Sequence, residues 1–270
     1  MRITSVIENK APEGLICEWG LCVHIEFEGK QYLLDTGSSD KYLRNVEPLG
    51  IHLEDVDAAA LSHAHFDPSG GYDSFFEKNQ KAKLYVRSEC AENCYSRHGL
   101  FRVYIGVPKG MLKKHRERIE MVEGDYMLAE NVWLVPHKID EPEELGKQAH
   151  MYVKVNHRFR PDGFRHEQSL VFKTDKGLVV LNSCSHGGAD NIINEVLATF
   201  PGEKMYAMIG GFHLKGRSEA SVRQFAARLK ECQVEHIYTG HCTGDKAFAI
   251  LQEMLGEKVH YFETGTVLEI

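Results

Sequence analysis

The sequence lacks any apolar run near the roughly twenty residues that a membrane-spanning helix requires. It also lacks a secretory signal, because an acid, Glu8, stands where such a signal would stay apolar. The seven cysteines form an odd set, which argues for reduced thiols and against a disulfide framework. The net charge of −7 disfavours a nucleic-acid partner, which requires a basic surface. We therefore expect a cytoplasmic protein without a membrane or nucleic-acid partner; the sequence leaves a homo-oligomer open.

The composition is typical of a globular protein, with 43% hydrophobic and 26% charged residues, and we expect one domain over residues 1–270. Alternation and apolar runs predict strands at 2–8, 20–28, 30–34, 58–61, 83–86, 170–172, 178–181, 205–209 and 235–238. Helical periodicity predicts helices at 40–46, 72–79, 192–197, 222–229 and 246–255. Strand clusters with helices between them favour an α/β protein in which two sheets pack face to face under covering helices.

The stretch Ser62-His63-Ala64-His65-Phe66-Asp67-Pro68 directly follows the apolar run at 56–61. Side chains at alternate positions past the end of a strand can converge on one point, so the two imidazoles can bind one cation. Asp67 offers a carboxylate to the same ion or to an adjacent one. Gly70 and Gly71 then allow a tight turn into the next helix. This pattern predicts a metal site.

Four motifs in the expected order resemble the metallo-β-lactamase superfamily, whose signature after a strand is His-x-His-x-Asp-His. They are Asp35-Thr36-Gly37, the 62–68 stretch, Ser183-Cys184-Ser185-His186-Gly187-Gly188, and Thr239-Gly240-His241-Cys242-Thr243-Gly244. With Gly210-Gly211-Phe212-His213-Leu214, the last two resemble the dihydropterin (ribofuranosylaminobenzene phosphate) synthase-like branch. The resemblance covers nearly the whole chain and implies a four-layer αββα sandwich.

The resemblance also implies the ligands. His63, His65 and His186 would bind one ion, whereas Asp67 and His241 would bind a second ion or complete the first, with Cys184 close enough to bridge. Such ligands favour zinc and leave iron or manganese open. His213 is either a partner that orients a ligand or a substrate contact, and Glu167 is an alternative ligand.

Pro68 departs from the superfamily pattern, because it stands where the third histidine of the signature is usual and its side chain has no metal-binding atom. We expect either one ion or a weakened second site. Residues of about 87–165 lack a clear period and are predicted to form an irregular insertion that lines the substrate. Within it, the segment 101–108 resembles a segment of the same branch, so Arg102 is a candidate substrate contact.

Three functions follow from the resemblance. The first is a metal-dependent hydrolase that acts on a small ester or phosphoester metabolite through metal-bound hydroxide, with Asp67 as the catalytic group that orients water and accepts its proton. The second is a dihydropterin phosphate synthase-like transferase. The third is a metal-containing ligand-binding or sensor protein with little turnover. The partner in all three is a small molecule.

Overall fold

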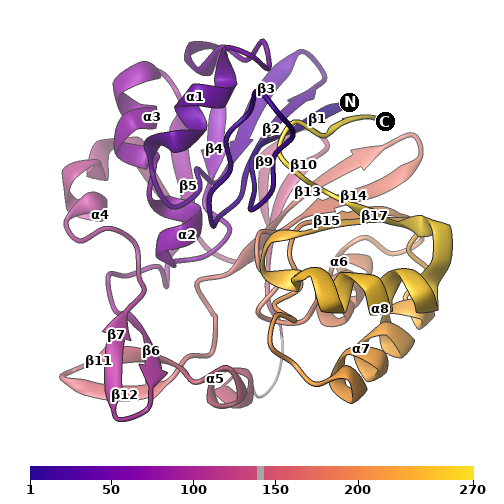
Figure 1. The fold of residues 1–270 in the computed structure, drawn as a ribbon. Helices are drawn as coiled ribbons and strands as arrows, with labels where there is room; N and C mark the ends of the chain where they lie inside the picture. Colours follow the sequence, from indigo (N-terminus) through magenta and orange to yellow (C-terminus); the bar gives the residue numbers. More distant parts are fainter. Residues whose placement is uncertain (139–142) are drawn as a thin grey trace.

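The computed structural model describes residues 1–138 and 143–270, and its strands form three sheets (Figure 1). The first sheet has the order β18 (Val267–Glu269), β1 (Arg2–Ile7), β2 (Cys22–Phe27), β3 (Lys30–Leu34), β4 (Ala58–Ala60), β5 (Lys83–Arg87) and β8 (Ile119–Val122). The second has the order β17 (Val259–Tyr261), β16 (His236–Thr239), β15 (Met205–Ile209), β14 (Gly177–Leu181), β13 (Gln168–Thr174), β10 (Val132–Pro136) and β9 (Tyr126–Ala129). The small third sheet has the order β12 (Arg158–Pro161), β11 (Met151–Val155), β6 (Cys94–His98) and β7 (Phe101–Tyr104).

Helices cover the outer faces of the two large sheets (Figure 1). The first sheet carries α1 (Leu43–Val46) and α3 (Tyr72–Lys78). The short helices α2 (Phe66–Ser69) and α4 (Met111–Lys114) belong to the same half of the chain. The second sheet carries α6 (Ala189–Thr199), α7 (Glu219–Glu231) and α8 (Asp245–Leu255). The remaining helix, α5 (Glu143–Ala149), precedes β11 of the small sheet.

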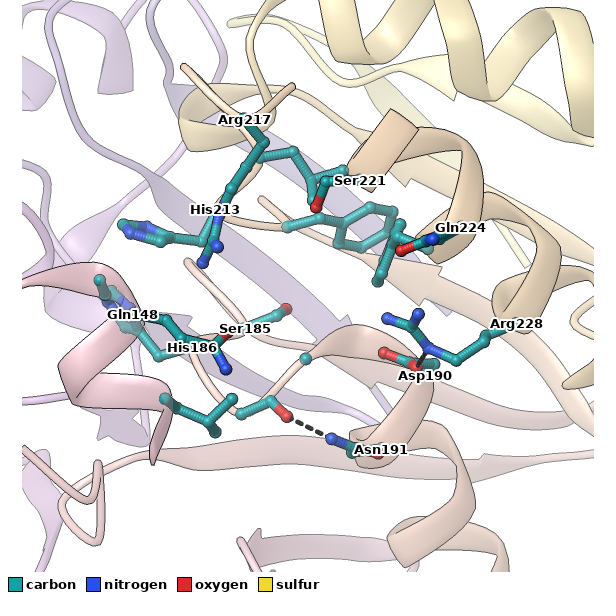
Figure 2. A pocket seen from close by; sticks show the side chains of 17 residues that line it. Gln148, Ser185, His186, Asp190, Asn191, His213, Arg217, Ser221, Gln224 and Arg228 are labelled. Carbon is teal, nitrogen blue, oxygen red and sulfur yellow. Dashed lines mark hydrogen bonds and ion pairs between the residues drawn. The ribbon is translucent and has the colours of Figure 1, made fainter. Parts of the chain in front are cut away.

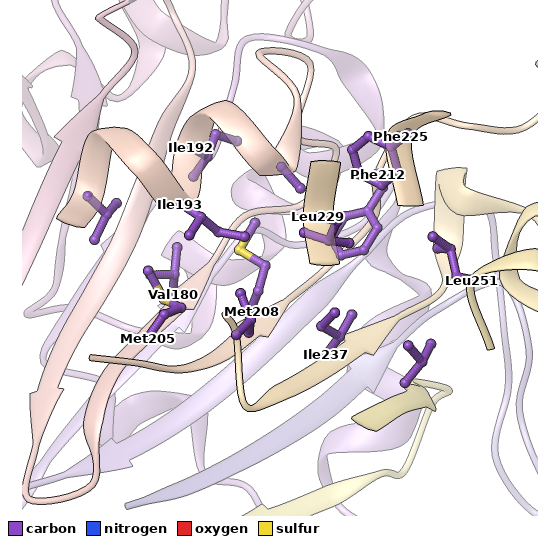
Figure 3. Packing of buried hydrophobic residues seen from close by; sticks show 14 of the residues in the cluster. Val180, Ile192, Ile193, Met205, Met208, Phe212, Phe225, Leu229, Ile237 and Leu251 are labelled. Carbon is purple, nitrogen blue, oxygen red and sulfur yellow. The ribbon is translucent and has the colours of Figure 1, made fainter. Parts of the chain in front are cut away.

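Three hydrophobic clusters separate these layers. One lies between the two large sheets and includes Val23 and Ile25 of β2 with Leu170 and Phe172 of β13. A second joins the first sheet to α3, and a third joins the second sheet to α6, α7 and α8, where isoleucine, leucine and phenylalanine side chains interlock (Figure 3). Helix, sheet, sheet and helix are therefore stacked in that order, which confirms the predicted αββα class.

The alternation at the start of β2 explains its place in this stack. Leu21, Val23, Ile25 and Phe27 all face the second sheet, whereas Cys22 joins the cluster under the helices. His24 is also buried, and its Nε2 lies 2.9 Å from Oε1 of Gln31 on β3. Glu26 is the one exposed residue of β2, so the strand is more deeply buried than its pattern indicates.

The segment 87–165 is more regular than the sequence predicts, apart from residues 139–142, which lie outside the described part. It supplies β8, β9 and β10 to the edges of the large sheets and all four strands of the small sheet. These strands have four or five residues and carry many half-exposed side chains, so they show little alternation.

The candidate site lies where parallel strands end. β3, β4 and β5 run parallel, as do β14, β15 and β16, and the loops after β4, β14, β15 and β16 carry the four histidine motifs. The crevice beyond the carboxyl ends of such strands is the usual place for ligands in open α/β sheets.

Candidate metal centre

Three imidazoles from two loops meet in one buried group. His63 and His65 follow β4 and His186 follows β14, and each offers a ring nitrogen within 4.8 Å of the others. All three are at least 93% buried. The Nε2 atoms of His63 and His65 and both ring nitrogens of His186 have no hydrogen-bond partner within the described ranges. Buried polar nitrogens are normally hydrogen-bonded, so unpaired nitrogens at this point are expected of imidazoles that bind a cation.

The protonation of these imidazoles fits the same role. Burial lowers the pKa of His63 to about 4 and lowers the pKa of His65 and His186 well below the usual value, with the neighbouring imidazoles adding to the effect in the latter two. All three are therefore neutral at neutral pH, which is the form that ligates a metal. The donor set and its unpaired nitrogens fit a divalent cation such as zinc.

A second group combines a carboxylate, an imidazole and two thiols: Asp67, His241, Cys184 and Cys242. The Nε2 atom of His241 lies 3.5 Å from Oδ2 of Asp67 and 3.3 Å from Sγ of Cys184. Ligand atoms of Cys184, His241 and Cys242 lie within 4.8 Å of one another, and so do those of His63, Asp67 and Cys184. Cys184 thus lies between the two groups. Cys242, which directly follows His241 in its motif, was not among the predicted ligands.

The N-terminal strand orients His241. Asn9 follows β1, and its Oδ1 accepts from the backbone N–H of Gly20 while its Nδ2 donates to the carbonyl of His241. Because this fixes Oδ1 as an acceptor, the contact of 3.1 Å between Oδ1 and Nδ1 of His241 places a proton on Nδ1. Nε2 then faces Cys184 and Asp67. Burial lowers the pKa of His241, but the charge of Cys242 and the hydrogen bond to Asp67 raise it to about 9, so Nε2 carries a proton that a bound cation would displace. Glu8 completes the arrangement by accepting from the backbone N–H of His241.

Asp67 is held as an anion. It lies in the first turn of α2, and Nε1 of Trp19 donates to its Oδ2 over 2.9 Å. Burial by itself would raise the pKa of Asp67, but the hydrogen bond and charge of His241 hold it well below the usual range. The carboxylate is therefore available as a ligand or as a proton acceptor at neutral pH.

Glu167 orients the His186 loop. Its Oε1 accepts from the backbone N–H of His186 over 2.8 Å, and its Oε2 accepts from that of Gly187 over 2.9 Å and also contacts Nε2 of His137. Burial would raise the pKa of Glu167, but the charge and hydrogen bond of His137 bring it to about 2. Since both oxygens are taken up by these donors, we assign Glu167 to orientation and not to the alternative role of metal ligand.

His65 touches a further cluster that the sequence analysis missed, formed with Cys94, Asp162 and His166. Nδ1 of His166 accepts from the backbone N–H of Ala64 over 3.1 Å, so its proton lies on Nε2, which donates to Oδ2 of Asp162 over 3.1 Å. A metal on Nε2 would conflict with this tautomer. Oδ2 of Asp162 lies 4.0 Å from Nε2 of His65. The cluster therefore places a carboxylate next to the imidazole of a predicted metal ligand.

Left-handed backbone recurs at the loops that carry these groups. Ser185, His213 and His241 have φ values of 50°, 49° and 49°, which is a conformation that residues with a Cβ adopt at a cost of about 1 kcal/mol or more each. Each lies in the turn directly after a strand of the second sheet. The turns therefore hold strained conformations where the site is built.

A cavity of about 390 Å³ opens over both groups, and residues of β6 and β11 border it. Its lining comprises Trp19, His65, Phe66, Asp67, Ser96, Arg97, His98, Ile105, Ala149, His150, Met151, Cys184, His186, His213 and Cys242. Arg102 is not among the lining residues; its guanidinium lies over the rings of Tyr152 and Phe159. The small sheet thus supplies one side of the cavity, while a substrate contact of Arg102 stays a prediction.

A smaller pocket of about 160 Å³ adjoins this cavity, and His186 and His213 line both (Figure 2). The ring of His213 lies 4.4 Å from that of His186. Arg217 and Arg228 border the pocket, and Arg228 is paired with Asp190 over 2.6 Å. The hydroxyl of Ser185, which is 1% exposed, has no partner in the described part of the chain. The pocket is therefore polar and carries positive charge.

The chain belongs to the metallo-beta-lactamase superfamily, whose family model matches residues 20–157. It is similar to the 7,8-dihydropterin-6-methyl-4-(beta-D-ribofuranosyl)-aminobenzene-5'-phosphate synthase of Methanocaldococcus jannaschii, with 28% identity over 267 residues, which cover 93% of this chain and 89% of that protein. These findings confirm the superfamily and the branch that the motifs indicate.

Solved structures agree with this assignment. A metal-dependent hydrolase of the beta-lactamase superfamily is 29% identical, with a TM-score of 0.84 over 100% of this chain and 99% of that chain. A diphosphatase of the PhnP family is 13% identical, with a TM-score of 0.57 over 100% of this chain and 97% of that chain, and shares the fold. In the described part of this chain, no helix has the length and apolar character to cross a membrane.

Proposed function

We propose that the protein is a metal-dependent hydrolase that acts on a small phosphoester or related ester. One observation carries this proposal: His63, His65 and His186 present buried, neutral and unpaired ring nitrogens within 4.8 Å of one another. A bound cation, with zinc favoured and iron or manganese open, would supply a Lewis acid that polarises a phosphoryl or carbonyl oxygen and lowers the pKa of water. The similar solved hydrolase supports the class.

The residues of this chain then perform the remaining steps. Asp67 accepts the proton of the attacking water, and Trp19 fixes the carboxylate through its indole N–H. Cys184 and His241 lie close to Asp67 and complete the polar surroundings of its carboxylate. The cavity over these groups takes the substrate, and residues of β6 and β11 exclude water from its outer side.

The adjoining pocket favours a phosphorylated substrate. Arg217 has no ion-pair partner among the described residues, and Ser185, whose buried hydroxyl is also unpaired among them, lines the same pocket (Figure 2). A guanidinium and a hydroxyl are suited to phosphate oxygens. Because His186 and His213 line both spaces, a substrate can place its reacting bond at the metal centre and a phosphate in the pocket.

A second candidate is transfer chemistry of the dihydropterin phosphate synthase type. The similar synthase supports it, since the two chains correspond over 93% of this one. The same metal centre would then activate a phosphorylated pterin or sugar for condensation. Product analysis distinguishes the two: hydrolysis releases an alcohol and an acid, whereas condensation joins two substrates.

The free thiols fit a reducing compartment such as the cytoplasm. All seven cysteines are unpaired, and Cys184 and Cys242 are buried at the metal centre. Reduced thiols persist where glutathione and thioredoxin systems operate.

The test measures metal content per chain by elemental analysis, then turnover of phosphoesters, uncharged esters and pterins. His63→Ala should lose metal and activity, whereas His52→Ala, which changes an exposed histidine outside the site, should retain both. Arg217→Ala should raise KM for phosphoesters and leave uncharged esters unaffected, with Arg44→Ala, which changes an exposed arginine of α1 outside both cavities, as the matched control. Metal binding without turnover of any substrate would instead support a sensor, and the absence of metal would refute the proposal.

A further inference from the structure

Cys242 lies at the candidate metal centre although it was not among the predicted ligands. It lies in the short turn η4 (His241–Thr243), and its thiol is 2% exposed. Ligand atoms of Cys242, Cys184 and His241 lie within 4.8 Å of one another, and Cys242 also lines the cavity. Two thiols and an imidazole therefore face one point beside Asp67.

The backbone around Cys242 is shaped to receive its sulfur. Gly211 lies so close that a Cβ there would come within 2.5 Å of Sγ of Cys242 and 2.7 Å of the carbonyl of Ser183. The backbone N–H of His213 donates to the same sulfur over 3.2 Å. Gly211 leaves room for the sulfur, and the N–H of His213 points at it. These two independent features both orient the thiol toward the centre.

The position that the superfamily signature gives to a histidine has no such donor. Pro68 lies in α2, and its carbonyl accepts from both the backbone N–H and the hydroxyl of Thr36. Neither its ring nor its carbonyl is free to bind a cation. A second ion beside Asp67 must therefore take its ligands from elsewhere.

The spacing of the remaining donors suits a tetrahedral ion. With zinc bonds of about 2.0 to 2.3 Å, ligand atoms on a tetrahedral ion lie about 3.3 to 3.8 Å apart. The Nε2 atom of His241 lies 3.5 Å from Asp67 Oδ2 and 3.3 Å from Cys184 Sγ. Nε2 is the ring nitrogen that would bind the ion, because Asn9 holds a proton on Nδ1.

We infer that Cys184, His241 and Cys242 form a second cation site beside Asp67, in which thiolates replace the histidine missing at Pro68. This inference rests on the proposed function, since it concerns the same centre. Two sulfur ligands select zinc, cobalt or ferrous iron over manganese or magnesium, which prefer oxygen. The protein would then pair an imidazole site and a thiolate-rich site across Asp67 and Cys184.

The test uses the intact protein loaded with cobalt(II) and, separately, with zinc. The cobalt form should hold two ions per chain and show a thiolate-to-cobalt charge-transfer band. Cys242→Ser should weaken that band and lower affinity for the second ion by roughly tenfold or more, since even changes behind a ligand cost that much. Cys232→Ser, which changes a cysteine at the end of α7 outside the centre, should leave both unchanged.

X-ray absorption on the unmodified zinc protein gives an answer that needs no variant. Two sulfurs shared between two ions predict an average of about one sulfur per zinc. Zinc with nitrogen and oxygen neighbours alone, or a charge-transfer band of full strength in Cys242→Ser, would overturn the inference. One ion bound by imidazoles with turnover intact would overturn the inference and leave the proposed function standing, whereas a protein without metal would remove both.

Discussion

Replacing Glu167 by glutamine should destabilise the protein more than any equally conservative change on its surface. The carboxylate is fully buried and serves His137 and the backbone N–H groups of His186 and Gly187. Glutamine keeps the shape, but its NH₂ cannot accept a hydrogen bond, so one buried donor loses its partner. Breaking a buried pair costs about 3–5 kcal/mol. We expect the lower end, because Glu195 still contacts Nδ1 of His137.

A loss of about 3 kcal/mol corresponds to a fall in Tm of very roughly 6–12 °C for a chain of this size. The assay is thermal unfolding of Glu167→Gln with and without metal. Because Glu167 holds the loop of His186, the stabilisation that metal adds should also shrink.

Glu195→Gln is the matched control. Its side chain is 12% exposed against 0% for Glu167, and the variant leaves the contact between His137 and Glu167 intact. It should therefore lower Tm by only a few degrees and keep the metal effect. Equal, small shifts in the two variants would refute the assignment of Glu167 as the group that holds this loop.

Three further changes test other contacts. Trp19→Phe removes the donor to Asp67 and should lower the affinity for the second ion about 10–100-fold in a metal titration. Tm should change little because the indole is 37% exposed. An unchanged affinity would contradict this prediction. Gly211→Ala forces a Cβ against Cys242 and should cost about 1–3 kcal/mol in denaturant unfolding together with the second ion. His24→Gln tests pH dependence: burial lowers the pKa of His24 below 6.5, so its stabilising effect is present above that pH and is lost as the pH falls toward the folded-state pKa. The variant should lose less stability than the natural protein between about pH 7.5 and 5.5, and an identical loss would refute this role.

The strands and helices of the two large sheets could be predicted because each carries a local pattern. The apolar run before His63 and the periodic apolar positions of α7 are examples. The short strands of the 87–165 segment could not, since strands of four or five residues at sheet edges bury too few side chains to show a period. Their regularity comes from pairing with strands far along the chain.

The candidate site likewise has residues that a local sequence pattern predicts and residues that only contacts between distant segments reveal. Histidines and Asp67 stand in motifs that are visible in the sequence. The structure brings His63, His65 and His186 together as one group and places His241 with Cys184 and Cys242 in another, 3.5 Å from Asp67. Cys242, Glu8 and Asn9 were missed because their roles depend on contacts that span most of the chain. Glu8 and His241, for instance, are separated by 233 positions. No local spacing rule reports such a pair.

The contact of Glu8 and Asn9 with His241 also sets an order of events during synthesis. The strand that orients this histidine is synthesised 233 residues before the histidine itself. A nascent chain can therefore assemble His63, His65 and His186 before His241 and Cys242 exist. The two halves of the centre would mature one after the other, with the thiol-bearing half closed only when the turn at His241 has emerged.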